Sequence, residues 1–84
     1  MIFPIVHFNG SGKKRLLENY EAAANAVQKA IDALQEAAPH GRDYYTIDDN
    51  AINEAIKDHK ERRRKLQEVF DDLAFIWEKV EEQK

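Results

Sequence analysis

Two long stretches of the chain repeat apolar residues at alternating spacings of four and three. This is the spacing of a heptad seam, which runs along one face of an α-helix and which a β-strand cannot produce. We therefore predict two helices, over residues 13–38 and 47–83. The seam positions are Leu16, Tyr20, Ala23, Val27, Ala30, Leu34 and Ala37 in the first stretch, and Ile52, Ile56, His59, Arg63, Leu66, Phe70, Leu73, Trp77 and Val80 in the second.

The residues between the two stretches predict a turn over residues 39–46. Pro39 and Gly41 end the first helix, because proline has no N–H to continue the hydrogen bonding and glycine accepts a left-handed conformation. Ser11 is the expected N-cap of the first helix, and the segment 46–49 supplies a cap for the second, where acids are favourable. The short connection makes the two helices antiparallel neighbours.

A short apolar arm and a glycine-rich elbow, residues 1–12, precede the first helix. If the helices pair from the turn outward, about ten residues at the end of the second helix have no partner, and these include Phe75 and Trp77. The arm lies at the same end, so it can fold back on this overhang in its own chain or in a neighbour's. A hairpin of this size buries little surface alone. We therefore predict a single all-α domain over residues 1–84, an antiparallel helical hairpin with a short apolar N-terminal arm, assembled into a homo-oligomeric helical bundle.

Composition narrows the classes of function. The 84 residues include 13 basic and 16 acidic side chains, a net charge of −3 that argues against whole-molecule attraction to nucleic acid or to an anionic membrane. Because there is no cysteine, disulfides and thiolate metal sites are excluded. No apolar run is long enough to span a bilayer, and residues 2–8 are too short and interrupted for a signal peptide. We expect a soluble, intracellular protein with no membrane partner.

Three cations follow the glycine-rich elbow at the start of the first helix. Glycines at such a place let successive backbone N–H groups converge on one point, where the helix dipole favours an anion. Cations in a first turn oppose that dipole, whereas a phosphate held by Lys13, Lys14 and Arg15 satisfies both. The spacing is not that of a Walker motif. The alternative is a flexible elbow followed by solvated cations that pair with Glu18 and Glu21.

The second helix is basic over residues 57–65, with six cations and two acids, and acidic over residues 66–84, with six acids and two cations. Such a split is typical of salt pairing with a neighbour or of a solvated face. His59 and Arg63 are polar members of the seam, where a charge is costly unless it is paired. Arg63 therefore needs an acid, a carbonyl or a ligand anion, and His59 is a candidate to assist it. The alternative is that both residues fix register or oligomeric state.

The turn carries a third cluster, in which two aromatic residues accompany an arginine. Tyr44 and Tyr45 are candidates to stack on a base while Arg42 holds a phosphate. The alternative is that the tyrosines cap the core of the hairpin and that Arg42 pairs locally with Asp43.

The sequence offers no arrangement that favours catalysis. The three histidines lie in different parts of the chain, and none is spaced four residues from another metal ligand, so no zinc site is expected. Adjacent aspartates point to different helix faces and do not form a carboxylate dyad. We therefore predict no catalytic residues, no metal, no cofactor and no enzymatic activity.

Several stretches resemble a group of small uncharacterised proteins of tailed bacteriophages. They are residues 3–10 (FPIVHFNG) with Leu16-Leu17, and residues 37–45 (AAPHGRDYY), and the similarity extends to His59 and Arg63. The resemblance implies a phage accessory protein acting in the cytoplasm of the bacterial host. Some helical phage proteins of this size are oligomeric sponges that trap nucleotide signals of host immunity, an analogy that suggests an anti-defence role. The sequence lacks the motif of the cyclic-dinucleotide sponges.

The hypothesis drawn from these observations is a binding protein, an oligomer of helical hairpins that sequesters a small anionic ligand such as a nucleotide immune signal. The alternative is a protein–protein inhibitor or structural adaptor that acts on a host or phage protein without a small ligand. Its working surface would be the two oppositely charged segments and an exposed face carrying Phe75 and Trp77. Nucleic-acid binding through residues 57–65 is a third possibility, weakened by the acidic flank.

Overall fold

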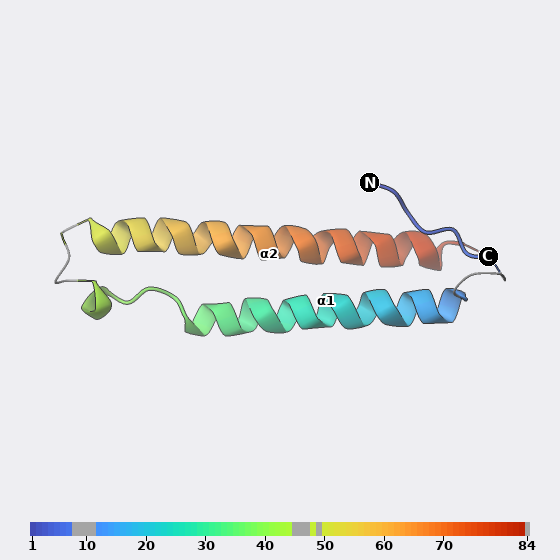
Figure 1. Cartoon of the computed structure of the whole chain (residues 1–84), viewed down its shortest axis with the longest axis horizontal. Helices are drawn as coiled ribbons and strands as arrows, with labels where there is room; N and C mark the ends of the chain where they lie inside the picture. The colour runs from blue at the N-terminus through green and yellow to red at the C-terminus, as the bar shows by residue number, and fades with distance from the viewer. Residues whose placement is uncertain (8–11, 45–47, 49, 84) are drawn as a thin grey trace.

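The fold is an antiparallel pair of long helices, as the heptad spacing predicts. We describe residues 1–7, 12–44, 48 and 50–83 of the computed structural model. Helix α1 spans Lys13–Glu36, the 3-10 turn η1 spans Gly41–Asp43, and helix α2 spans Ala51–Glu81. No strand occurs in these described ranges. The two helices lie side by side along a molecule with extents of 60 × 20 × 16 Å (Figure 1).

Both predicted helices are shorter in the structure at the end that meets the connection. Helix α1 ends two residues early, at Glu36, because the residue before a proline is disfavoured in the helical conformation and Ala38 precedes Pro39. Helix α2 begins at Ala51 rather than at residue 47. Just before it, Asp48 Oδ1 accepts a 2.8 Å hydrogen bond from the backbone N–H of Asn50, a local turn that competes with helix.

The role predicted for Gly41 is wrong. Neither Gly12 nor Gly41 has a positive φ, and Gly41 is instead the first residue of η1, well after the end of α1. The turn is held locally, since His40 Nδ1 accepts a 3.2 Å hydrogen bond from the backbone N–H of Arg42. Gly12 stands at the N-cap of α1, without a side chain to cap it, and the predicted cap Ser11 lies outside the described residues. Of the segment 46–49 predicted to cap the second helix only Asp48 is described, and the N-cap of α2 is Asn50, which makes no side-chain cap hydrogen bond.

The predicted overhang is at the wrong end of the hairpin. The Lys13 ammonium donates hydrogen bonds to the carbonyl oxygens of Glu81 at 2.7 Å and Gln83 at 2.5 Å, so the start of α1 lies level with the end of α2. The part of α2 that extends beyond α1 is therefore at the turn, as Figure 1 shows. Residues 37–44, which follow α1, run along this part of α2 (Figure 1).

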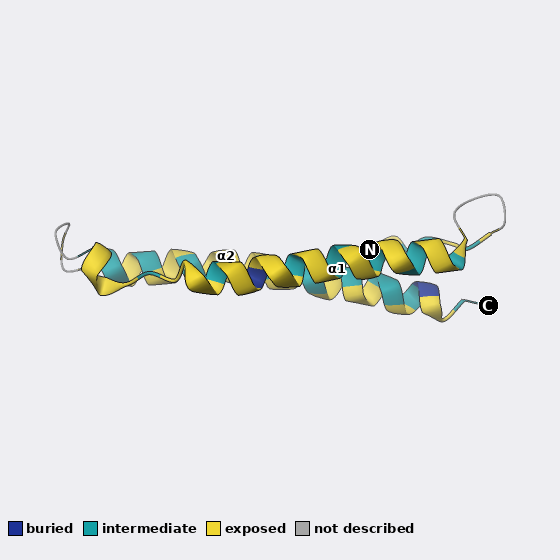
Figure 2. Cartoon of the chain, turned by 90° about the horizontal axis from the view of Figure 1, so that it is seen from below, coloured by how far each residue is buried: buried dark blue, intermediate teal, exposed yellow. Residues whose placement is uncertain are grey.

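The core between the helices is very small. Among the described residues only Ile31 and Val80 are buried, at 2% and 0% exposure, and Figure 2 shows both helices mostly exposed or half-buried. Ile31 replaces Ala30 as the inward residue of the predicted seam, and Ala30 and Ala37 are exposed. The larger isoleucine buries more apolar area, and its four-residue spacing from Val27 is equally compatible with a helix face.

The N-terminal residues contact α2 of the same chain. The side-chain amide of Gln83 makes two hydrogen bonds to the arm. Its Oε1 accepts a hydrogen bond from the backbone N–H of Val6 at 2.7 Å, and its Nε2 donates one to the carbonyl oxygen of Pro4 at 2.8 Å. The ring of Phe3 meets that of Phe75 edge to face, with centroids 5.3 Å apart. These contacts cover only part of the arm, because Ile2 and Ile5 remain 94% and 78% exposed.

Candidate functional site

The three cations at the start of α1 do not act together. The Lys13 ammonium is bound to the carbonyls at the end of α2, where a cation is also favoured by the helix dipole. This geometry gives Lys13 a structural role. Lys14 and Arg15 are exposed and line an open depression with Gly12, Glu18 and Asn19.

Lys14 forms the surface pairing that was the alternative for this cluster. Its ammonium lies 3.9 Å from a Glu18 carboxylate oxygen, with both side chains largely exposed. Pairs of this kind contribute at most about 1 kcal/mol. The start of α1 therefore presents two solvated cations with an acid beside them rather than an enclosed anion site.

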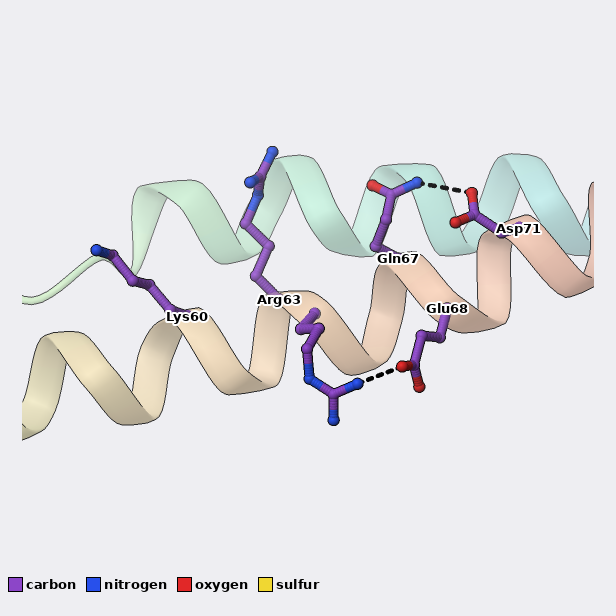
Figure 3. Close-up of a pocket in the computed structure, with 6 residues that line it drawn as sticks. Lys60, Arg63, Gln67, Glu68 and Asp71 are labelled. Atoms are coloured by element: carbon purple, nitrogen blue, oxygen red, sulfur yellow. Dashed lines mark hydrogen bonds and ion pairs between the residues drawn. The ribbon is translucent and has the colours of Figure 1, made fainter.

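Arg63 lies on a shallow hollow in the basic part of α2. Figure 3 shows Arg63 and Gln67 on one side of the helix and Glu68 on the other, with Gln67 Nε2 donating to Asp71 Oδ1 at 3.0 Å. Arg63 is exposed and makes no hydrogen bond or ion pair with another described residue. Its long stem leaves the seam and places the guanidinium in solvent, so the buried unpaired charge expected from the sequence does not arise. The hollow is lined by Lys60, Arg63, Arg64, Gln67, Glu68 and Asp71.

The neighbouring Arg64 is already engaged by carboxylates. Its guanidinium donates to both carboxylate oxygens of Glu61, at 2.9 and 2.6 Å, and also to Glu68. These hydrogen bonds hold the pKa of Glu61 below its usual range and raise the pKa of Arg64. One cation of the basic segment is thus paired with two acids, and the hollow is lined by charges of both signs.

At the turn, the structure brings Tyr44 and His59 to one hollow, as members of a lining that also contains Arg62. Three acids, Asp48, Glu54 and Asp58, belong to the same lining, so its charge does not favour an anion. The remaining lining residues are small or apolar: Ala37, Pro39, Ala51 and Ala55.

Arg42, the third member predicted for the turn, is not part of this hollow. It is exposed, and its described hydrogen bond is made by the backbone N–H to His40. Tyr45 lies outside the described residues. The combination of stacking rings with an arginine that the sequence suggested is therefore not assembled by the residues that the structure describes.

The predicted ligand-binding residues form three separate groups in one chain. Because Lys13 binds the end of α2, the start of α1 lies about 27 Å along α2 from Arg63, at 1.5 Å per residue. His59 is one helical turn from Arg63 but faces the hollow at the turn. A single phosphate cannot touch all three groups, so a composite site requires residues from more than one chain.

One feature that sequence reasoning missed is an aromatic hollow between the helices. Tyr20, Phe70 and Trp77 line it together with Glu21, Ala24, Asn25 and Ala74. The indole Nε1 of Trp77 is buried without a hydrogen-bond partner in the described part of the chain. All three aromatic residues stand on the predicted seams, so the signal was present, but a seam position is normally taken as core.

The described residues contain no cluster of three or more side chains suited to hold a metal ion. None of the described helices has the length and apolar character needed to cross a membrane. Comparison of the chain with protein-family models, with curated proteins and with solved structures finds no match.

Proposed function

We propose that this chain is an interaction protein, a helical hairpin that works by packing against further helices in a homo-oligomer. The observation that carries the proposal is the size of the core. Two fully buried side chains, Ile31 and Val80, do not supply the apolar burial that a stable domain of this length needs.

The accessible surface supports this proposal. The chain exposes 6664 Å², whereas a folded monomer of 9.8 kDa exposes about 5,200 Å². The radius of gyration, 18.5 Å, compares with about 12 Å for a compact chain of 84 residues. The excess of roughly 1,500 Å² is what one chain loses in an obligate dimer.

The exposed side chains are also those of an interaction surface. Val69 and Phe75 are 46% and 44% exposed on α2, and Ile5 extends from the arm. Charged side chains of both signs surround them, divided into a basic segment, residues 57–65, and an acidic one, residues 66–84. Apolar anchors within a charged surrounding are typical of protein interfaces.

The test is the dependence of thermal unfolding on protein concentration, followed by circular dichroism from about 1 to 100 µM. If folding is coupled to assembly, the midpoint rises with concentration, because association stabilises only the folded chain. A cooperative transition with the same midpoint over that range would contradict the proposal. A tag-free sample is needed, since the arm packs next to the C-terminal residues.

Capture of a small anionic ligand is the second candidate. The observation in its favour is Arg63, which is exposed beside Lys60 and makes no ion pair with the described residues. In an oligomer, Lys14 and Arg15 of one chain can meet Arg63 of another, and a nucleotide would then be held between chains. The phage resemblance suggests sequestration of an immune signal in the host cytoplasm as its setting.

Isothermal titration with nucleoside mono-, di- and cyclic phosphates separates this candidate from the first. Binding that is lost in Arg63→Ala and in Lys14→Ala/Arg15→Ala supports capture between chains. Lys29→Ala is the matched control, because it removes an exposed cation from α1 outside all three groups. Unchanged binding in the test variants, or no binding by the wild type, would reject this candidate and leave the interaction protein untouched.

A further inference from the structure

Helix α2 carries a second heptad stripe, displaced around the helix from the seam that faces α1. Its apolar member in the middle, Val69, is 46% exposed, and its charged members are all exposed. Within the described part of the chain, neither Arg62 nor Asp72 forms an ion pair. Charges of both signs along one face of a helix can pair with those of a neighbouring helix and set its direction, as the charged flanking positions of coiled coils do. The stripe consists of Ala55, Asp58, Arg62, Lys65, Val69, Asp72 and Ile76.

We propose that a second copy of this chain packs antiparallel along this stripe, so that Arg62 of each copy faces Asp72 of the other. The two hairpins then form a four-helix bundle with a twofold axis near Gln67. This arrangement rests on the proposed function, because it specifies the partner and the surface through which the hairpin completes its core.

The charge pattern selects the antiparallel direction. In an antiparallel pair, the basic segment of each α2, residues 57–65, lies beside the acidic part of the other, which begins at residue 66. A parallel pair would place the two basic segments together, and like charges across an interface are unfavourable. The basic end of α2 is therefore complementary in charge to the acidic end of α2 in another copy, and neither end is complementary to its own equivalent.

The stripe also selects the register. Gln67 lies midway between Arg62 and Asp72, and close to the middle of α2, so a pair centred there overlaps along almost the whole helix. Val69 then packs against the stem of Lys65 from the other copy. A shift of one heptad places Arg62 opposite Lys65 in one direction and opposite Lys79 in the other, and both juxtapose cations.

Helix α1 leaves room for this approach. Five alanines at spacings of four and three, all exposed, lie on one face of α1 and its C-cap, and small side chains permit close helix packing. The last of them, Ala37, lines the same hollow as Ala55 and Arg62 of α2, so this face borders the stripe at the turn. The five are Ala22, Ala26, Ala30, Ala33 and Ala37.

Charge reversal tests the arrangement, with the dissociation constant measured by sedimentation equilibrium. Arg62→Asp and Asp72→Arg each place like charges in contact at two symmetry-related positions, so each raises the constant by about tenfold or more. The double variant Arg62→Asp/Asp72→Arg restores opposite charges and returns the constant to within about threefold of wild type. Lys57→Asp is the matched control, since it also replaces an exposed cation of the basic segment by an acid, off the stripe.

A cross-linking measurement tests the register independently. The chain has no native cysteine, so single substitutions can be mixed without background. Lys65→Cys mixed with Val69→Cys forms an intermolecular disulfide under mild oxidation, whereas Lys57→Cys mixed with Val69→Cys does not.

The outcomes separate this inference from the proposed function. A wild-type chain that is monomeric at 100 µM overturns both. A wild-type oligomer in which both reversals change the dissociation constant no more than Lys57→Asp does, or in which the double variant fails to recover, overturns only the arrangement. Weaker association of both single variants, with recovery of the wild-type dissociation constant in the double variant, supports the antiparallel arrangement.

Discussion

The two ends of the hairpin are held in different ways. At the end that contains both chain termini, Lys13, Gln83 and Phe3 each make a contact with a segment more than sixty residues away, and Val80 is completely buried. At the turn, the described hydrogen bonds of His40 and Asp48 reach only two or three residues along the chain. Tertiary contacts thus close one end, while local turns shape the other.

This difference places His59, Arg63 and the turn residues in the less constrained half, whereas Lys13, Lys14 and Arg15 lie at the end closed by tertiary contacts. His59 and the basic segment follow the part of α2 that extends beyond α1, and Ala30, which the seam predicted to be inward, is exposed. Exposed helix with few tertiary contacts opens at low free energy unless something covers it. The comparison therefore predicts large effects of mutation at the chain-terminal end and a stabilising role for a partner at the other.

The largest effect is expected for Val80→Ala. Removing two methyl groups from a fully buried position destabilises the fold by about 2 kcal/mol, through lost burial and the cavity that remains. Urea unfolding followed by circular dichroism measures it. Ile5→Ala is the control, because Ile5 is 78% exposed and its truncation changes stability by less than about 0.5 kcal/mol. Equal effects in the two variants would contradict the distinction between core and arm.

Next in size is Gln83→Ala. This change removes hydrogen bonds to both Val6 N–H and Pro4 O and costs about 1–2 kcal/mol. Hydrogen exchange at the Val6 amide should become faster as the arm detaches. Gln28→Ala is a matched control, since among the described residues the Gln28 amide bonds only to the exposed Asp32. If hydrogen exchange at the Val6 amide stays slow in Gln83→Ala, the hydrogen bonds of the Gln83 amide do not hold the arm in place.

A smaller loss is expected for Lys13→Ala, about 1 kcal/mol, because the carbonyls of Glu81 and Gln83 lose a charged donor. The neighbouring Lys14→Ala removes only an exposed pair with Glu18 and should change the free energy of unfolding by a few tenths of a kcal/mol. Thermal unfolding of the two variants compares them directly. An effect of Lys14→Ala as large as that of Lys13→Ala would exclude the assigned difference in role.

The smallest effect concerns Glu61, in the half near the turn. Hydrogen bonds from Arg64 lower the pKa of Glu61 in the folded chain. The stability that this pair contributes is therefore present above the pKa of an unfolded glutamate, about 4.3, and is lost as pH falls through the lower pKa of the folded chain. Glu61→Gln should therefore flatten the acid side of the stability profile slightly, and its difference from wild type should shrink as pH falls. A profile identical to wild type between pH 3 and 6 would show that the exposed pair contributes nothing.

The hairpin could be predicted from sequence because the heptad spacing of α1 and α2 is long and regular. The register could not, because helix lengths alone do not say whether a connection closes tightly or runs back along α2, and only the contact of Lys13 with Glu81 decides this. The sequence pattern predicted Ala30 rather than Ile31 as the inward residue, because both positions satisfy helical spacing. Only the size of the side chain distinguishes the two.

Of the candidate site, the sequence predicted the residue types but not their grouping. From the sequence, Lys13 is expected to be a free cation, and only the position of the end of α2 beside it shows otherwise. Arg63 is expected to be buried because it lies on the seam, whereas its stem carries the guanidinium away from the seam. The pairing of Tyr44 with His59 in one hollow depends on the path of the connection, which no local pattern specifies.

Native mass spectrometry of the untagged protein, purified gently from bacterial lysate, tests the central claim most directly. It reports the number of chains and any retained small molecule in one spectrum. We expect an assembly of two or more copies, and additional mass of nucleotide size would add support for ligand capture between chains. A single bare chain at concentrations of tens of micromolar would contradict the claim that the hairpin completes its core with another copy.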